Sequence, residues 1–266
     1  LETPLSVTDP QTEKQLTEKG TVEFKNVSFS YPGSSEKVIK NVNFRAEKGE
    51  TVAFIGSTGS GKSTLINLVP RFFDATEGEV LVDGVNVKEI KQKTLRSLIG
   101  YVPQKGLLFS GTVKSNIAFG KEDLSEEQII NAAKIAEADE FITKMEKGYD
   151  SEISQGGKNV SGGQKQRLSI ARAVAIDPEI FIFDDSFSAL DYKTDKKVRE
   201  NLKEGAKGAT KLIIAQRIGT ILDADKIIVL DSGNVVGCGK HKELLESCDV
   251  YREIAVSQLS KEELGL

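Results

Sequence analysis

Short runs of consecutive apolar residues recur along the chain and predict buried β-strands. The clearest runs cover residues 52–55, 180–183, 212–215 and 227–230. A strand that is apolar on both faces is typical of a parallel sheet covered by helices on both sides. No run exceeds four residues, whereas a helix that crosses a bilayer needs roughly 20. The sequence therefore predicts an α/β domain and no membrane-spanning segment.

The segments between these runs differ in pattern. Alternating character over 22–24 and 27–31 predicts strands that end at the Pro32-Gly33 turn. Between about 105 and 176 apolar residues recur at helical spacing, which predicts a helical insertion within one sheet domain. Residues 1–20 show no periodicity and are expected to form a linker or arm, and the missing initial Met suggests an excised fragment or a processed product.

Composition narrows the functional classes. A length of 266 residues predicts one to two domains, and 36 basic against 40 acidic residues give a net charge of −4. This balance provides no field that would attract nucleic acid or an anionic membrane. Cys238 and Cys248 form neither a disulfide framework nor a zinc-binding spacing, and the single histidine, His241, excludes a site that needs several imidazoles. A reducing, cytosolic setting is the default expectation.

A glycine-rich segment directly after the 52–55 run matches the phosphate-binding loop pattern. It precedes an apolar helix expected from about Lys62, so backbone N–H groups can turn toward phosphate oxygens at a helix N-terminus. In this pattern the Lys62 ammonium reaches the β- and γ-phosphates and the Ser63 hydroxyl binds Mg²⁺; the alternative is a simple glycine-rich turn. The predicted loop consists of Gly56, Ser57, Thr58, Gly59, Ser60, Gly61, Lys62, Ser63 and Thr64.

An apolar strand that ends in a carboxylate supplies the expected second half of such a site. Asp184 follows the 180–183 run, where the C-terminal edge of a parallel sheet would place it beside the phosphate loop. We therefore expect Asp184 to hold Mg²⁺ together with Ser63.

A third motif points to one specific protein family. Val160 is followed by Ser161, Gly162, Gly163 and Gln164, which resembles the Leu-Ser-Gly-Gly-Gln signature of ATP-binding cassette (ABC) proteins. In isolation the segment could equally be a helix capped by Ser161. Ser161 lies 99 positions after Lys62, however, and together with the phosphate loop the segment resembles an ABC nucleotide-binding domain.

The resemblance extends over about 21–245 and implies roles for further residues. Tyr31 resembles the aromatic residue that stacks on adenine, and Gln104 resembles the loop glutamine that contacts Mg²⁺ and relays to a membrane domain. Residues 188–191 resemble the loop that crosses the dimer interface. Residues 107–113 with Asn116 and Ile117 resemble exporters of the multidrug, peptide and lipid type.

The fold implied by the resemblance is a P-loop NTPase (RecA-like) parallel-sheet core with an N-terminal antiparallel β subdomain and an inserted α-helical subdomain. The expected boundaries are a core over about 21–104 and 177–250, a helical subdomain over about 105–176, and C-terminal helices over about 240–266 within a domain covering 21–266. The implied ligands are ATP and Mg²⁺. The implied partners are a second nucleotide-binding domain and the coupling helices of a transmembrane domain at the cytoplasmic face of the membrane, with no nucleic acid.

Three positions depart from the family pattern. Asp185 stands where a Glu acts as general base, so the carboxylate lies one methylene, roughly 1.5 Å, further back. Gln216 stands where a His contacts the γ-phosphate, and an amide cannot become an imidazolium. Gln155 lies where exporters often carry a Glu that faces the coupling helices.

These departures favour the weakly hydrolysing half of a heterodimeric exporter, with Asp185, Gln216 and Gln104 as its catalytic residues. The partner is expected to carry the intact Glu and His, and Ser161 of this chain would complete the partner's site. The alternatives are a competent homodimeric exporter ATPase, a DNA- or chromosome-acting cassette ATPase, and a binding module or kinase that uses the phosphate loop alone. The spacing of 99 positions leaves no room for the long coiled coils of the chromosome class.

Overall fold

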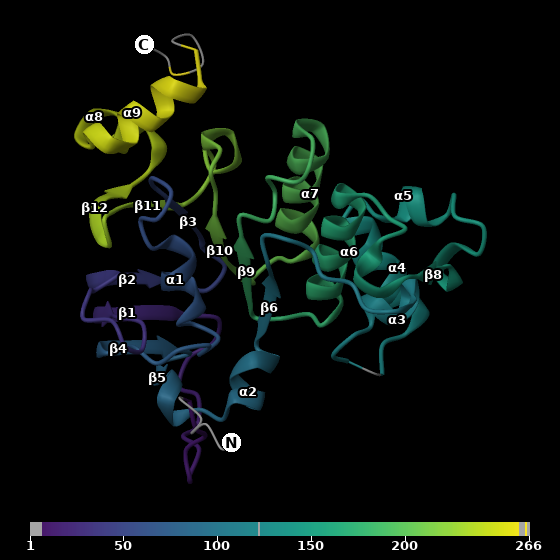
Figure 1. Ribbon diagram of the computed structural model, residues 1–266, viewed down its shortest axis with the longest axis horizontal. Coiled ribbons are helices and arrows are strands. Elements are labelled where there is room, and N and C mark those ends of the chain that lie inside the picture. Colours follow the sequence, from purple (N-terminus) through teal and green to yellow (C-terminus); the bar gives the residue numbers. More distant parts are fainter. Residues whose placement is uncertain (1–6, 122, 261–263, 265–266) are drawn as a thin grey trace.

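The computed structural model describes residues 7–121, 123–260 and 264, and it has an α/β architecture (Figure 1). A six-stranded sheet has the order β12-β11-β3-β10-β9-β6, in which the pairs from β11 to β6 are parallel and β12 is antiparallel to β11. The four predicted apolar runs lie in or next to β3, β9, β10 and β11, as expected for buried parallel strands. The strands are β3 (Thr51–Ile55), β6 (Ile99–Val102), β9 (Ile180–Asp184), β10 (Thr210–Ile214), β11 (Lys226–Asp231) and β12 (Asn234–Gly239).

A second, antiparallel sheet with the order β2-β1-β4-β5 lies beside the first (Figure 1). The register of β1 shifts between Lys25 and Ser28, where Asn26 has a positive φ of 50° that asparagine tolerates well. Its strands are β1 (Val22–Phe29), β2 (Ile39–Ala46), β4 (Glu77–Val82) and β5 (Val85–Asn86).

Four helices gather on the far side of β6 and β9, away from the antiparallel sheet (Figure 1). They are α3 (Val113–Ile117), α4 (Glu126–Ile135), α5 (Asp139–Ile142) and α6 (Gly162–Ala175), with the short strands β7 (Gly111–Thr112) and β8 (Glu152–Ile153) between them. Thr112, Ser125 and Ser161 begin α3, α4 and α6 as capping boxes, each satisfying N–H groups that the helix leaves unpaired.

The remaining helices cover the sheets or connect strands. These are α1 (Lys62–Asn67), α2 (Gln92–Ser97), α7 (Tyr192–Gly205), α8 (His241–Ser247) and α9 (Asp249–Gln258), with 3₁₀ turns η1 (Val87–Glu89), η2 (Gly148–Asp150), η3 (Gln155–Gly157) and η4 (Ile218–Thr220). Within the described residues, no helix has the length and apolar character needed to cross a membrane. The part of the expected C-terminal helices at 261–263 and 265–266 lies outside the described residues.

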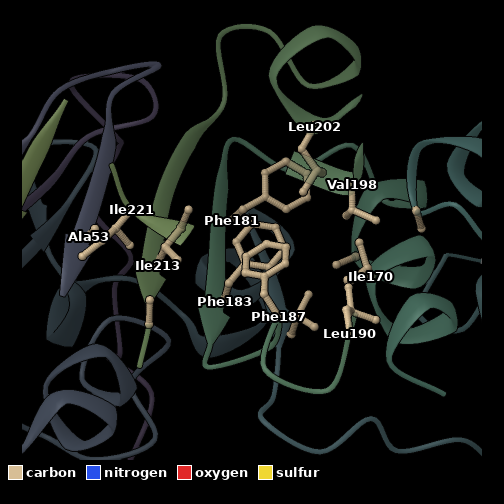
Figure 2. Close-up of a cluster of buried hydrophobic side chains, with 14 of the residues drawn as sticks. Ala53, Ile170, Phe181, Phe183, Phe187, Leu190, Val198, Leu202, Ile213 and Ile221 are labelled. Atoms are coloured by element: carbon tan, nitrogen blue, oxygen red, sulfur yellow. The ribbon is translucent and has the colours of Figure 1, made fainter. Parts of the chain in front are cut away.

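Two hydrophobic cores lie on opposite faces of the parallel sheet, which explains why its strands contain runs of consecutive apolar residues. Alternate residues of β9 face different cores: Ile180 and Ile182 face the antiparallel sheet and α1, whereas Phe181 and Phe183 face α6 and α7. Figure 2 shows these two phenylalanines packed with Phe187 beneath side chains of α7. The Phe181 and Phe183 rings are stacked with centroids 5.7 Å apart.

Residues 7–20 follow the edge of the antiparallel sheet without regular secondary structure; residues 1–6 of the predicted arm lie outside the described residues. The backbone N–H groups of Thr17 and Glu18 donate to the carbonyl of Asp83, and that of Lys14 donates to the carbonyl of Glu89. Side chains of the same segment accept from the start of α2. The 7–20 segment, called the arm below, is thus bonded to the sheet at several points.

Candidate functional site

The predicted phosphate loop lies between β3 and α1. Three of its glycines have a backbone conformation that other residue types rarely adopt. Gly56, Gly59 and Gly61 have φ of 152°, 82° and 99°. A Cβ on Gly56 would overlap the carbonyl oxygen of Leu230, and one on Gly61 would lie 2.7 Å from Ile39 Cδ1. The space over Gly59 is open, with no atom within 4 Å of a Cβ placed there. The loop therefore forms a backbone cradle of the kind that binds phosphates.

The Lys62 side chain folds back across this cradle. Its Nζ donates to the carbonyls of Gly56 and Ser57, both at 2.8 Å, and to Ser60 Oγ at 3.3 Å. Burial lowers the pKa of Lys62, while the carboxylates of Asp185 and Asp184 oppose this shift. The ammonium group thus lies at the loop, where it can exchange carbonyl partners for phosphate oxygens.

Ser63 and Asp184, predicted as metal ligands from distant parts of the sequence, lie in direct contact. Ser63 Oγ donates to Asp184 Oδ1 at 2.7 Å, and Tyr101 Oη donates to Asp184 Oδ2 at 3.3 Å. Burial raises the pKa of Asp184, and the hydrogen bonds from Ser63 and Tyr101 oppose this shift. A hydroxyl and a buried carboxylate side by side match the hard oxygen ligands that Mg²⁺ takes beside a nucleotide, so these residues fit the ion.

Asp185, Gln104 and Gln216 converge on a single oxygen atom. The side-chain amides of Gln104 and Gln216 both donate to Asp185 Oδ2, at 2.9 Å and 2.7 Å. Asp185 is buried and has a φ of 49°, and its N–H donates to the carbonyl of Ile214 on β10. The three residues predicted as catalytic thus form one cluster, which we call the amide clamp.

Tyr31 lies just beyond β1 and next to α1. Its Oη is 2.9 Å from Thr64 Oγ1, and its ring packs edge-on against Phe29 and Phe73. The residue keeps 39% of its surface exposed. An accessible aromatic ring therefore lies beside the phosphate loop, as stacking on an adenine base requires.

The signature segment is not part of this cluster. Ser161 Oγ accepts from the Gln164 N–H at 3.3 Å and Gln164 Oε1 accepts from the Ser161 N–H at 2.9 Å, which confirms Ser161 as the N-cap of α6. No side-chain hydrogen bond or ion pair among the described residues joins Gly162 or Gly163, or either capping residue, to the phosphate loop. Ser161 and Gly162 at the start of α6 are exposed.

Two glutamines that the sequence did not mark as site residues connect the site to helices. The Gln166 amide on α6 donates to the carbonyl of Pro103 at 2.9 Å and accepts from the N–H of Gly106 at 2.8 Å, so it holds the loop that carries Gln104. Gln258 on α9 bonds to the backbone of the loop that carries Gln216. Of these two glutamines, only Gln166 could have been found from the sequence, because it lies in the segment that continues the signature motif.

A basic groove of about 640 Å³ runs between α2, β6 and α6. It is lined by Lys93, Arg96, Lys121 and Arg172, and none of these forms an ion pair within the described part of the chain. Burial lowers the pKa of Arg172 to about 10, and its guanidinium lies over the stacked rings of two exposed aromatic residues, Phe109 and Phe119. The groove therefore combines positive charge with exposed aromatic surface. Gln155 is exposed on η3, a separate turn of the helical group.

Comparisons with known proteins agree with this geometry. Residues 39–188 match the model of the family described as "ABC transporter". Proteins of Staphylococcus aureus strains NCTC 8325 and N315, each named "Putative multidrug export ATP-binding/permease protein", are 45% identical over 236 residues. The match covers 89% of this chain and 41% of each relative, so the chain spans about two fifths of the length of these proteins.

A solved structure described as a bacterial Atm1-family ABC exporter with ATP bound superposes with a TM-score of 0.92 at 36% identity. The superposition covers 97% of this chain and 45% of the other. It confirms the predicted fold: a P-loop NTPase core with an additional antiparallel sheet and an inserted group of helices. With the family match over residues 39–188, these findings show that the chain belongs to the ABC transporter family.

Proposed function

We propose that the chain is the ATP-binding domain of a membrane exporter and that it binds ATP with Mg²⁺ at the phosphate loop. The observation that carries this proposal is the contact between Ser63 and Asp184 beside the Lys62 ammonium. The names of the relatives, multidrug export proteins and an ABC exporter with ATP bound, support it.

Titration of the protein with a fluorescent ATP analogue tests binding. Lys62→Ala should weaken binding at least tenfold, because the ammonium is the cation nearest the phosphates. Lys144→Ala is the matched control, since Lys144 is exposed and pairs with Glu140 on the surface of the helical group. Equal affinities of wild type and Lys62→Ala would refute the proposed site.

The residues have separate tasks in hydrolysis. Backbone N–H groups of the loop and Lys62 bind the phosphates, and Ser63, Asp184 and Gln104 would hold Mg²⁺, which neutralises phosphate charge when bound. Asp185 orients the attacking water and takes up its proton while the bond from the γ-phosphorus to the ADP oxygen breaks. Tyr31 supports the adenine base by stacking.

Hydrolysis at this chain's own site should be slow. Asp185 is one methylene shorter than the family's Glu, which sets its carboxylate roughly 1.5 Å further back. A misplacement of about 1 Å can lower the rate on the order of 10²-fold. We therefore infer an asymmetric heterodimer in which a partner domain supplies the intact Glu and His, and the exposed Ser161 end of α6 completes the partner's site.

Steady-state ATPase of the purified chain tests the slow site, because turnover above about 1 s⁻¹ would contradict it and favour a competent homodimer. Asp185→Glu should raise the rate only partly, while Asp185→Glu combined with Gln216→His should raise it further. Full recovery in the single variant would argue against a role for Gln216.

The basic groove is the proposed contact with the transmembrane domain, which would place the chain at the cytoplasmic face of the membrane. Its four cations, which form no ion pair with any residue that the structure describes, favour a coupling segment that carries acidic side chains next to apolar ones, because buried interfacial charge requires a partner of opposite sign. Charge reversal at Lys93 and Lys121 together should uncouple ATP turnover from transport in the assembled exporter. Unchanged transport would exclude the groove as the docking site.

A further inference from the structure

We propose that Gln258, in the last turn of α9, is a positioning residue that sets the orientation of Gln216 in the amide clamp. This inference rests on the proposed ATPase function and extends it to a helix far from the phosphate loop in sequence. No motif marks Gln258, and its role follows from its contacts alone.

The Gln258 side chain bonds to the backbone on both sides of Arg217. Its Nε2 donates to the carbonyl of Gln216 at 2.8 Å, and its Oε1 accepts from the N–H of Ile218, also at 2.8 Å. Both functional groups of one amide are thus used on one peptide segment. This arrangement fixes the backbone from which the Gln216 side chain extends toward Asp185.

The helix that carries Gln258 is firmly packed. Tyr251 and Ala255 of α9 are fully buried in the core, and Tyr251 Oη lies 2.7 Å from His241 Nδ1 on α8. Gln258 therefore extends from a fixed support, although its own side chain is exposed.

The opposite side of the same loop is held less tightly. The Arg217 guanidinium donates to the carbonyls of Ser188 and Leu190, both at 3.3 Å. Without Gln258 the loop would keep these longer bonds, the contact between Gln216 and Asp185, and two backbone bonds of 3.2 Å, from the Ala215 N–H to the Phe54 carbonyl and from the Thr220 N–H to the Arg217 carbonyl. Because Gln216 is one of two donors to Asp185 Oδ2, loosening its backbone would release the carboxylate from the orientation that positions water.

The experiment measures kcat and KM for ATP with radiolabelled phosphate release, using the whole 266-residue chain. Gln258→Ala should lower kcat about fivefold to tenfold, as expected for the loss of one or two hydrogen bonds, with KM within twofold of wild type. Ser257→Ala is the matched control, because the Ser257 hydroxyl bonds to the Ile254 carbonyl of its own helix. Thermal unfolding midpoints should agree among the three proteins.

A double-mutant cycle decides whether Gln258 acts through Gln216. In a Gln216→Ala background, Gln258→Ala should have no further effect on kcat. An equal further fall there, or an unchanged kcat in Gln258→Ala alone, overturns the inference while ATP binding and turnover by the wild type stand. Bound ATP that the wild type never hydrolyses also overturns it, and a wild type that fails to bind ATP refutes the proposed function as well.

Discussion

Replacing Asp83 with asparagine should stabilise the protein at neutral pH. Asp83 follows β4 and is fully buried; its Oδ1 accepts from the N–H of Thr21 at 2.9 Å, but Oδ2 has no hydrogen-bond donor among the described residues. The carboxyl group of Glu179 lies beside it. Burial first, and the Glu179 carboxylate second, raise the pKa of Asp83 to about 6.

The direction in which stability changes with pH follows from the number of protons that the folded and unfolded states bind. The unfolded chain loses the Asp83 proton near pH 3.8 and the folded protein near pH 6, so the folded state binds the additional proton between these values. Stability therefore falls as pH rises through this window, and the loss persists above it. The folded and unfolded pKa values of Asp83 differ by about two units, which lowers the free energy of unfolding by about 3 kcal/mol in total. Roughly 1.5 kcal/mol of this loss develops between pH 5 and pH 7.5.

The asparagine of the Asp83→Asn variant would keep the acceptor for Thr21 and provide an amide donor toward Glu179, and asparagine tolerates the positive φ of 49° found here. Urea unfolding from pH 5 to pH 8 measures the difference between Asp83→Asn and wild type. This difference should grow in favour of the variant by about 1.5 kcal/mol, whereas the exposed control Asp223→Asn should show no such trend. A difference that does not vary with pH, or a variant less stable at pH 7.5, would refute the reasoning.

Two further predictions concern the nucleotide and signature segments. Tyr31→Ala should weaken ATP affinity about tenfold through loss of the stacking surface, while Tyr31→Phe, which loses only the hydroxyl beside Thr64, should stay within about threefold in the same fluorescence titration. Ser161→Ala should lower the free energy of urea unfolding by about 1 kcal/mol, because the Gln164 N–H loses its cap, and a loss below about 0.3 kcal/mol would show that the capping box contributes little.

The main fold could be predicted because its decisive elements leave local patterns. Parallel strands between two cores carry runs of consecutive apolar residues, and β9 shows such a run at Ile180 to Phe183. The strands β5, β7 and β8 have two residues each, too few for any periodicity to appear. The arm is likewise held by backbone groups and scattered polar side chains, which no pattern in its sequence reveals.

The site, too, could be predicted from the sequence only in part. Ser63 and Asp184 could be paired in advance because loop and strand geometry bring them to one edge of the sheet. The convergence of Gln104 and Gln216 on one oxygen of Asp185 could not, since it depends on side-chain rotamers in loops from three parts of the chain. Gln166 and Gln258 were missed because their partners are backbone groups, which have no sequence signature.

The bonding of the arm has a mechanical consequence. Its backbone bonds to Asp83 and Glu89 and its side-chain bonds to the start of α2 lie one after another along the sheet edge. The arm is therefore attached both to the turn after β4 and to the start of α2. Movement of the arm would act on the antiparallel sheet and on α2 at the same time, and α2 lines the basic groove through Lys93 and Arg96.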